Sequence, residues 1–303
     1  MDLGVGLPTS YPLASPEAIL RIAQEAEDLG YAAVWTFERL LYALGDVPQP
    51  GGPPRPLPKA YRSVYEPVET LSWLAARTST IKLGTSVLDA PFHNPVLMGR
   101  RLATLDRLSG GRVIAGFGQG WMDQEFVAAG VTKEHFPRRV REFVSAIRAV
   151  WGPDPVSFDG RFYRIPESLI DPKPAQAGGI PILMGVFAPA AIRRAGRIAD
   201  GFNPIAISYE WLVWAVEQFR NAAGAAGRDA GALKVIVRAN VPVTEEPIMD
   251  GRPYLGGSPE QIAGDLEALD GLRVDQVFFS NNSPAGLEEH VKILGSLKRA
   301  VEG

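Results

Sequence analysis

Eight short apolar segments are spaced along the chain, and most of them precede ten or more residues with helical periodicity. We expect β-strands at Leu3–Leu7, Ala32–Thr36, Ile81–Ser86, Val113–Gly118, Ile180–Gly185, Gly201–Ile205, Val235–Val241 and Gln276–Ser280. Several are apolar on both faces, as in Val113-Ile114-Ala115, which is typical of parallel strands covered on both sides. Eight alternating strand–helix units predict an α/β fold, a closed (β/α)8 TIM barrel.

The main alternative is an open, doubly wound sheet, which binds dinucleotides through a Gly-x-Gly-x-x-Gly turn after its first strand. The segment Gly4–Thr9 lacks the third glycine and has Pro8 where that helix would begin. A barrel of about 250 residues with insertions also accounts for the 303 residues as one domain, residues 1–303, without an internal linker.

Five expected helix starts are marked by a residue followed by proline. Proline at the first helical position loses no intrahelical hydrogen bond, and a preceding Ser or Asn can cap the exposed N–H groups. The five dipeptides are Ser15-Pro16, Asn94-Pro95, Ala188-Pro189, Ser258-Pro259 and Ser283-Pro284.

Two insertions interrupt the regular repeat. Leu40–Val64 follows the second strand and contains six prolines and three glycines, so it cannot form a helix or a central strand. We expect a structureless lid loop at the carboxyl-terminal mouth, where barrel active sites lie; the other interpretation is a floppy insertion. Gly152–Gly179 precedes the fifth strand, and its Asp159-Gly160 between aromatic residues predicts a tight hairpin.

Composition excludes several classes of protein. A chain with 46% hydrophobic residues buries a core, and the absence of cysteine removes disulfides, thiolate nucleophiles and iron–sulfur clusters. His93, His135 and His290 are too scattered for a spacing-based metal motif, so we expect no metal. A net charge of −3 without a run of five Lys or Arg disfavours nucleic acid. Without a signal-peptide pattern or a long apolar run, we expect no membrane partner and a cytoplasmic enzyme.

Several motifs resemble the luciferase-like monooxygenase superfamily, and within it the branch of coenzyme F420-dependent oxidoreductases. They occur in the family's order and run through most of the chain. The matching segments are Leu83–Val87, Asn94–Val96, Leu105–Arg112, Gly116–Gly118, Pro172–Pro174, Pro181–Gly185 and Ala199–Gly201.

The resemblance implies a barrel with a flavin or 5-deazaflavin at its mouth, a small-molecule substrate and a homodimer. In the F420 branch, the pair matching Ser86-Val87 forms a bulge with a non-proline cis peptide behind the ring; the alternative is an ordinary strand end. Gly185–Pro189 resembles the family's phosphate cradle, because glycine admits a ligand close to the backbone and a helix start offers N–H groups.

Eleven residues around these loops are expected to bind the cofactor, which is coenzyme F420 or alternatively FMN. Trp121 could instead be a core tryptophan. The expected residues are Trp35, Thr85, Ser86, Val87, Gly118, Gln119, Trp121, Gly185, Val186, Phe187 and Ala188.

Three titratable residues are candidates for catalysis. Glu38 could donate a proton from a partly dry pocket, and Arg39 could hold an anionic or carbonyl oxygen; the alternative is that both only order the lid. His93 follows the third strand and could deliver a proton or line the pocket. Many F420 relatives have histidine where this chain has Arg39, and the sugar-phosphate dehydrogenases have glutamate at Gln119.

These departures disfavour sugar-phosphate dehydrogenation. The resemblance therefore favours an F420-dependent oxidoreductase that transfers a hydride between the deazaflavin C5 and a small organic substrate, as in reduction of C=C, C=N or C=O. Two alternatives stay open, namely an FMN-dependent luciferase-like monooxygenase and a non-catalytic flavin- or deazaflavin-binding protein.

Overall fold

A computed structural model of the chain describes residues 1–49, 52–281 and 286–302. All eight expected barrel strands are present, although the fifth and the sixth are each three residues shorter than expected. They are β1 (Asp2–Gly6), β2 (Ala33–Thr36), β5 (Lys82–Thr85), β7 (Val113–Gly118), β10 (Ile182–Met184), β11 (Gly201–Phe202), β12 (Lys234–Ala239) and β13 (Gln276–Phe279).

The strands form one closed parallel sheet. Neighbours pair in the order β10-β11-β12-β13-β1-β2-β5-β7, and β7 pairs with β10 to close the ring. A short strand, β6 (Leu88–Asp89), adds to β7 in parallel register. The prediction of a (β/α)8 TIM barrel is therefore confirmed, and all strand carboxyl ends meet at one mouth.

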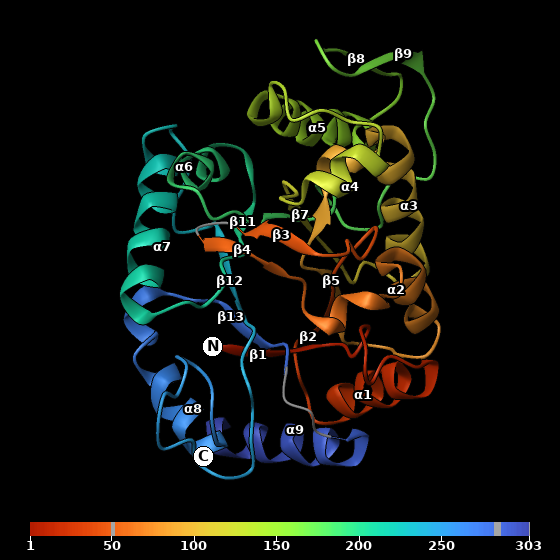
Figure 1. Cartoon of the computed structure of the whole chain (residues 1–303). Coiled ribbons are helices and arrows are strands. Elements are labelled where there is room, and N and C mark those ends of the chain that lie inside the picture. Colours follow the sequence, from red (N-terminus) through yellow and green to blue (C-terminus); the bar gives the residue numbers. More distant parts are fainter. Residues whose placement is uncertain (50–51, 282–285, 303) are drawn as a thin grey trace.

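Helices surround the strands (Figure 1). They are α1 (Pro16–Asp28), α2 (Pro67–Ala75), α3 (Pro95–Leu108), α4 (Asp123–Ala128), α5 (Phe136–Trp151), α6 (Pro189–Ile198), α7 (Tyr209–Gly224), α8 (Pro259–Glu267) and α9 (Leu287–Glu302). Four of the five proline-marked starts begin a helix at the expected residue. The fifth, Ser283-Pro284, lies outside the described residues. None of the described helices has both the length and the hydrophobicity that spanning a bilayer requires.

The first insertion is not the structureless loop that we expected. It contains an antiparallel hairpin of β3 (Asp46–Gln49) and β4 (Gly52–Pro56), followed by the 3-10 helix η1 (Lys59–Arg62). Proline is tolerated there because a two-stranded ribbon leaves edge positions without ladder partners. Buried Val47 and Leu57 pack with Met122, which holds the insertion against the loop after β7.

The second insertion forms the expected hairpin, between β8 (Val156–Asp159) and β9 (Arg164–Ser168). Its strands are joined by four residues rather than by a two-residue turn, because Asp159 pairs with Arg164. Glu142 on α5 accepts the Phe162 and Tyr163 N–H groups at 2.6 and 2.8 Å, which fixes that turn. Both insertions lie where the sequence placed them.

Trp35 fills the interior of the barrel. Its ring stacks on Phe278 with 4.8 Å between centroids, and its indole N–H donates to Gln276 at 2.8 Å. A side chain on Gly84 would overlap the Trp35 ring, so glycine is required on the neighbouring strand. With 1% of its surface exposed, Trp35 is a core residue in this structure, contrary to our assignment of it to the cofactor site.

Candidate active site

Three loops expected to bind one ligand meet at Val87. The peptide between Ser86 and Val87 is cis, in agreement with the resemblance. A Cβ on Gly185 would lie 2.6 Å from Cγ1 of Val87, and a Cβ on Gly118 would overlap Cγ2 of the same residue. The ends of β5, β7 and β10 therefore share one closely packed platform, which only glycines at 118 and 185 permit.

The loop after β10 continues from this platform to the start of α6. Ala188 is the N-cap of α6, and its side chain makes no capping hydrogen bond. Phe187 is 48% exposed and stacks on Trp211 of α7, with 5.3 Å between ring centroids. Val186 is 9% exposed. An uncapped helix start beside an exposed aromatic ring is suited to an anionic group attached to a flat molecule.

Two residues that the sequence analysis missed contact the platform from the other side of the mouth. The Ser86 hydroxyl donates to Oδ1 of Asn203 at 2.5 Å, and Asn203 donates to the Ile236 carbonyl at 2.7 Å. Arg238 donates to the Ser86 carbonyl. Asn203 and Arg238 lie at the carboxyl ends of the sixth and seventh barrel strands, so a search of every strand end would have found them.

Arg238 is a half-buried cation without a carboxylate partner. Its Nε donates to Oδ1 of Asn240 at 2.7 Å, and its guanidinium lies 5.3 Å from the centroid of the Phe37 ring. No ion pair to Arg238 exists in residues 1–49, 52–281 and 286–302. Burial lowers the pKa of Arg238, and the nearby charge of Arg39 adds to this effect. Such a group is suited to an anionic or carbonyl oxygen of a ligand.

Two of the catalytic candidates, Glu38 and His93, lie together. Nε2 of His93 is 2.8 Å from Oε1 of Glu38, whose Oε2 accepts the backbone N–H of Asp89 at 2.7 Å. The Glu38 N–H donates to the Val87 carbonyl at 3.1 Å, so this pair lies next to the platform. Glu38 is only 3% exposed, which places it in the wall of the mouth.

Arg39 points to a different partner. Its Nη1 lies 2.5 Å from Oε2 of Glu125, and the other oxygen of Glu125 accepts the Leu40 N–H at 2.9 Å. The guanidinium lies 5.2 and 5.3 Å from the ring centroids of Tyr61 and Trp121. Burial raises the pKa of Glu125, and Arg39 opposes that shift. Arg39 therefore ties the Pro-rich insertion to α4, and Trp121 is part of the same contact.

Asp89 is a third buried carboxyl group at this wall. Its Oδ1 accepts the Gly120 N–H at 2.7 Å, and only 5% of the residue is exposed. Burial raises the pKa of Asp89 to about 7, against the influence of Arg39 and with that of Glu38. The sequence analysis did not identify Asp89, because its raised pKa depends on burial by residues that are distant in the sequence.

The remaining candidates have clear positions. The Thr85 hydroxyl donates to the Gly116 carbonyl and accepts its N–H at 3.0 and 2.9 Å, so its polar atoms are used inside the barrel wall. Gln119 lies half-buried in the loop after β7. His135 is exposed beside the start of α5, whereas His290 is buried in α9.

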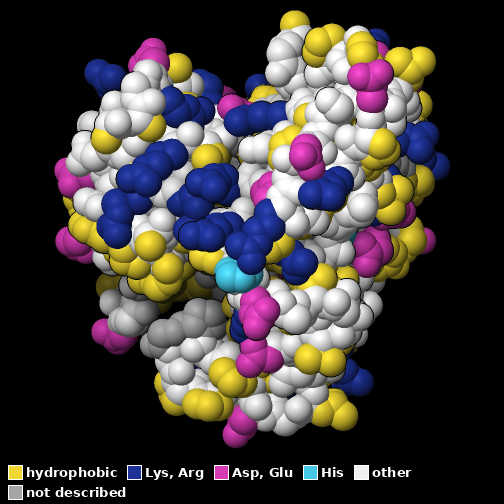
Figure 2. Space-filling view, turned by 90° about the horizontal axis from the view of Figure 1, so that it is seen from above, with side chains coloured by type: hydrophobic (Ala, Val, Ile, Leu, Met, Phe, Trp, Pro, Cys, Tyr) yellow, Lys and Arg dark blue, Asp and Glu magenta, His cyan; other side chains and the backbone are white. Residues whose placement is uncertain are grey.

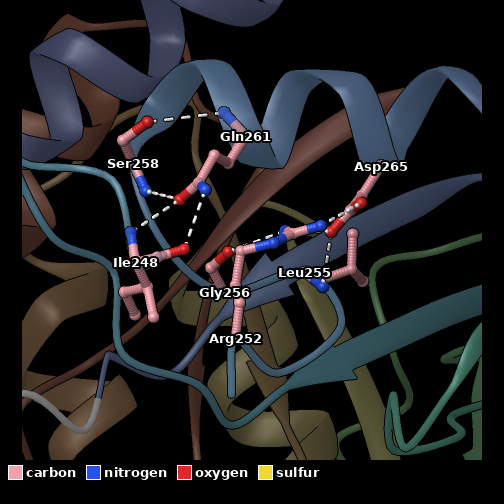
Figure 3. Close-up of polar contacts among 7 residues, drawn as sticks. All are labelled: Ile248, Arg252, Leu255, Gly256, Ser258, Gln261 and Asp265. Atoms are coloured by element: carbon pink, nitrogen blue, oxygen red, sulfur yellow. Dashed lines mark hydrogen bonds and ion pairs between the residues drawn. The ribbon is translucent and has the colours of Figure 1, made fainter. Parts of the chain in front are cut away.

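The loop after β12 is anchored to α8 (Figure 3). Arg252 forms two contacts with Asp265, at 2.6 and 2.9 Å. The Gln261 side chain accepts the N–H groups of Ile248 and Ser258 at 2.9 and 3.1 Å. These contacts fix the rim of the mouth next to Arg238 without using a side chain of the platform.

A cavity of about 460 Å³ opens at the other pole, where the strands begin. Three of its charged lining residues are already engaged: Arg112 donates to the carbonyls of Ala75, Thr78 and Ile81, and Lys234 pairs with Asp275 at 2.7 Å. The chemistry-bearing residues converge at the mouth instead. We therefore place the candidate active site there.

The family model for luciferase-like monooxygenases matches residues 2–248. The chain belongs to this family. A curated relative named F420-dependent glucose-6-phosphate dehydrogenase, from Amycolatopsis mediterranei, is 31% identical over 66% of this chain and 56% of its own length. A second of that name, from Nocardia farcinica, is 42% identical over 44% of this chain and 41% of its own length. The chain thus matches only about half of these relatives.

Another relative is named FMNH(2)-dependent dimethylsulfone monooxygenase, from Pseudomonas putida, and is 31% identical over 73% of this chain and 60% of its own length. Among solved structures, the coenzyme F420 dependent tetrahydromethanopterin reductase from Methanopyrus kandleri superposes with a TM-score of 0.77 at 20% identity, over 99% of this chain and 98% of its own. At this identity the likeness bears on the fold alone.

Proposed function

We propose that the protein is an F420-dependent oxidoreductase that transfers a hydride between the deazaflavin C5 and a small organic substrate. The observation that carries the proposal is the platform of Val87, Gly118 and Gly185, which joins three loops at the mouth. The relatives named as F420-dependent support the choice of cofactor.

The residues present suit such a cofactor. Val87 between two glycines offers an apolar backing for a flat ring, and the uncapped start of α6 suits a phosphate group. Arg238 supplies a cation without a carboxylate partner for a ring or substrate oxygen. Ser86, Val87, Gly118 and Gly185 would hold the ring, and Val186, Phe187 and Ala188 its phosphate side.

The bound deazaflavin supplies hydride chemistry, and the chain supplies position, exclusion of water and a proton. The insertion, which the contact of Arg39 with Glu125 holds in place, would cover one side of the mouth and exclude water there. Asp89 can carry a proton near neutral pH, and the contact of Glu38 with both the Asp89 N–H and His93 fixes the histidine ring. We favour reduction of C=C, C=N or C=O, because Arg39 and Gln119 stand where the resemblance places the histidine and the glutamate of sugar-phosphate dehydrogenation.

Titration of the purified protein with oxidised F420, followed by fluorescence, tests this function. We expect saturable binding, and oxidation of reduced F420 when a suitable acceptor is added. Binding of FMN without binding of F420 would overturn the proposal. Light scattering of the same sample tests the homodimer that the resemblance implies, and fractionation of the source cells tests a cytoplasmic location.

A second candidate is an FMN-dependent monooxygenase, which the relative from Pseudomonas putida favours. Reduced FMN and O₂ would then be consumed together with a substrate. Oxygen-electrode measurements with FMNH₂ and with reduced F420 separate the two candidates, because only the flavin supports oxygen activation.

A further inference from the structure

We infer that a surface of six arginines beside the mouth binds the anionic tail of the cofactor. This inference rests on the proposed function. The surface, which we call the arginine face, is formed by the first turns of α5, by α6 and by the turn of the β8–β9 hairpin. Its residues are Arg138, Arg139, Arg141, Arg161, Arg193 and Arg194.

The arginines converge although they come from three segments. The guanidinium groups of Arg139 and Arg161 both lie 5.5 Å from the centroid of the Phe162 ring. Across the helix pair, the positive charge of Arg141 lowers the pKa of Arg194 in addition to the effect of burial. Figure 2 shows Lys and Arg side chains gathered across the centre of the face seen from above.

Opposite charge is scarce at the arginine face. None of the six arginines forms an ion pair with a carboxylate in the described parts of the chain, although thirteen ion pairs occur elsewhere there. The nearby Glu142 carboxylate accepts two backbone N–H groups of the hairpin turn. His135 lies 3.3 Å from Nη2 of Arg161 and adds no negative charge. Asp159, in the β8–β9 hairpin, pairs with Arg164 at 3.1 Å.

Two of the arginines also have unsatisfied hydrogen-bonding capacity. The Nε atoms of Arg139 and Arg194 are buried and have no hydrogen-bond partner. The concentration of positive charge is notable because the whole chain has a net charge of −3. Uncompensated guanidinium groups favour binding of phosphate and carboxylate groups.

The position of the arginine face indicates which ligand would bind there. α6 begins directly after the Gly185–Ala188 loop, the proposed site for the cofactor's phosphate, and Arg193 and Arg194 lie on the first two turns of this helix. Arg138 and Arg139 lie on the first turn of α5, which packs beside α6. A tail that leaves the platform at α6 therefore passes onto the arginine face. Coenzyme F420 carries a phosphodiester followed by glutamate carboxylates, which match this surface in charge.

The test compares F420 with its tail-less chromophore, the ribityl-deazaflavin that lacks the phosphate and the glutamates. We expect the wild-type protein to bind F420 at least tenfold more tightly than the tail-less compound at low salt. That ratio should fall as salt is added, because exposed charges are screened. Equal dissociation constants for the two compounds at low salt would overturn the inference while leaving the proposed function intact. Binding of neither compound would instead overturn the proposed function, and the inference with it.

Two charge-reversal substitutions test whether the arginine face causes the tighter binding of F420. Arg138→Glu combined with Arg193→Glu should weaken F420 binding at least tenfold and change binding of the tail-less compound less than twofold. Both side chains are exposed, so the barrel should remain folded. Arg21→Glu with Arg299→Glu makes the same change of charge on α1 and α9 and should leave both affinities within twofold. Equal loss for both ligands in the first variant, or equal effects of the two variants, would overturn the inference.

Discussion

The backbone N–H of Asp89 donates to Oε2 of Glu38 at 2.7 Å, which joins two buried acidic residues in the wall of the mouth. Burial, together with the Glu38 charge, raises the pKa of Asp89 to about 7. Asp89 can therefore stay protonated near neutral pH, next to Glu38, whose other carboxyl oxygen contacts His93.

The Asp89 pKa predicts a pH-dependent stability. The carboxyl titrates near 3.9 in the unfolded chain and near 7 in the folded protein, so folding is favoured at low pH and loses that contribution as pH rises towards 7. Asp89→Asn removes the titration. We expect its unfolding free energy, relative to wild type, to increase by about 2–3 kcal/mol between pH 5 and pH 8.

Urea unfolding at the two pH values measures this difference. Asp159→Asn, at an exposed residue of the β8–β9 hairpin, is the matched control and should show no such change. If Asp89→Asn and wild type lose stability in parallel between pH 5 and pH 8, the buried carboxyl does not titrate in this range.

The contact between Arg39 and Glu125 should stabilise the Pro-rich insertion. Removing one member leaves the other buried and unpaired, since the Glu125 side chain is 1% exposed. Arg39→Met should cost about 3–5 kcal/mol of unfolding free energy, and Arg39→Met with Glu125→Gln should recover part of that loss. Arg101→Met, at the exposed pair with Glu69, should cost about 1 kcal/mol or less. Similar costs for the two single variants would contradict a buried ion pair.

Arg238 should contribute to ligand binding and little to stability. Its charge has no carboxylate partner, so Arg238→Met removes a desolvated cation and should change the unfolding free energy by about 1 kcal/mol or less. The same variant should lower kcat/KM at least about tenfold, because a charged hydrogen bond is worth about 1.5–3 kcal/mol. Arg77→Met, at an exposed arginine over Trp73, should leave kcat/KM unchanged. A large loss of stability in Arg238→Met would assign Arg238 to the scaffold.

The strand–helix alternation was sufficient to predict the barrel because each strand is a local apolar run, and because four of the described helices begin at a proline-marked start. Motif resemblance placed Ser86-Val87, Gly118 and Gly185 in neighbouring loops, and strand order then brought them together. The hairpin within Leu40–Val64 was missed, because its pairing is not visible in a segment dominated by proline.

The polar residues in the wall of the mouth were predicted only in part. Glu38 and His93 were found as single titratable residues, but their contact depends on the path of two separate loops. Asp89 and Glu125 owe their altered pKa values to burial, which no local pattern reports. Trp35 was misassigned because a tryptophan near a strand end can point to the mouth or into the barrel. Here the ring points into the barrel, where Gly84 on the neighbouring strand leaves space for it.

The last prediction concerns the platform: a second substitution should restore part of the cofactor binding that the first one weakens. Gly185→Ala places a methyl group 2.6 Å from Cγ1 of Val87, so it should displace Val87 and weaken F420 binding at least tenfold. Val87→Ala removes the methyl groups that collide, so the double variant should bind F420 more tightly than Gly185→Ala alone. Gly264→Ala, where a Cβ meets nothing within 4 Å, controls for a glycine substitution as such and should bind normally. Fluorescence titration of the four proteins measures the coupling, and strictly additive effects on the binding free energy would mean that Val87 and Gly185 do not share one ligand platform.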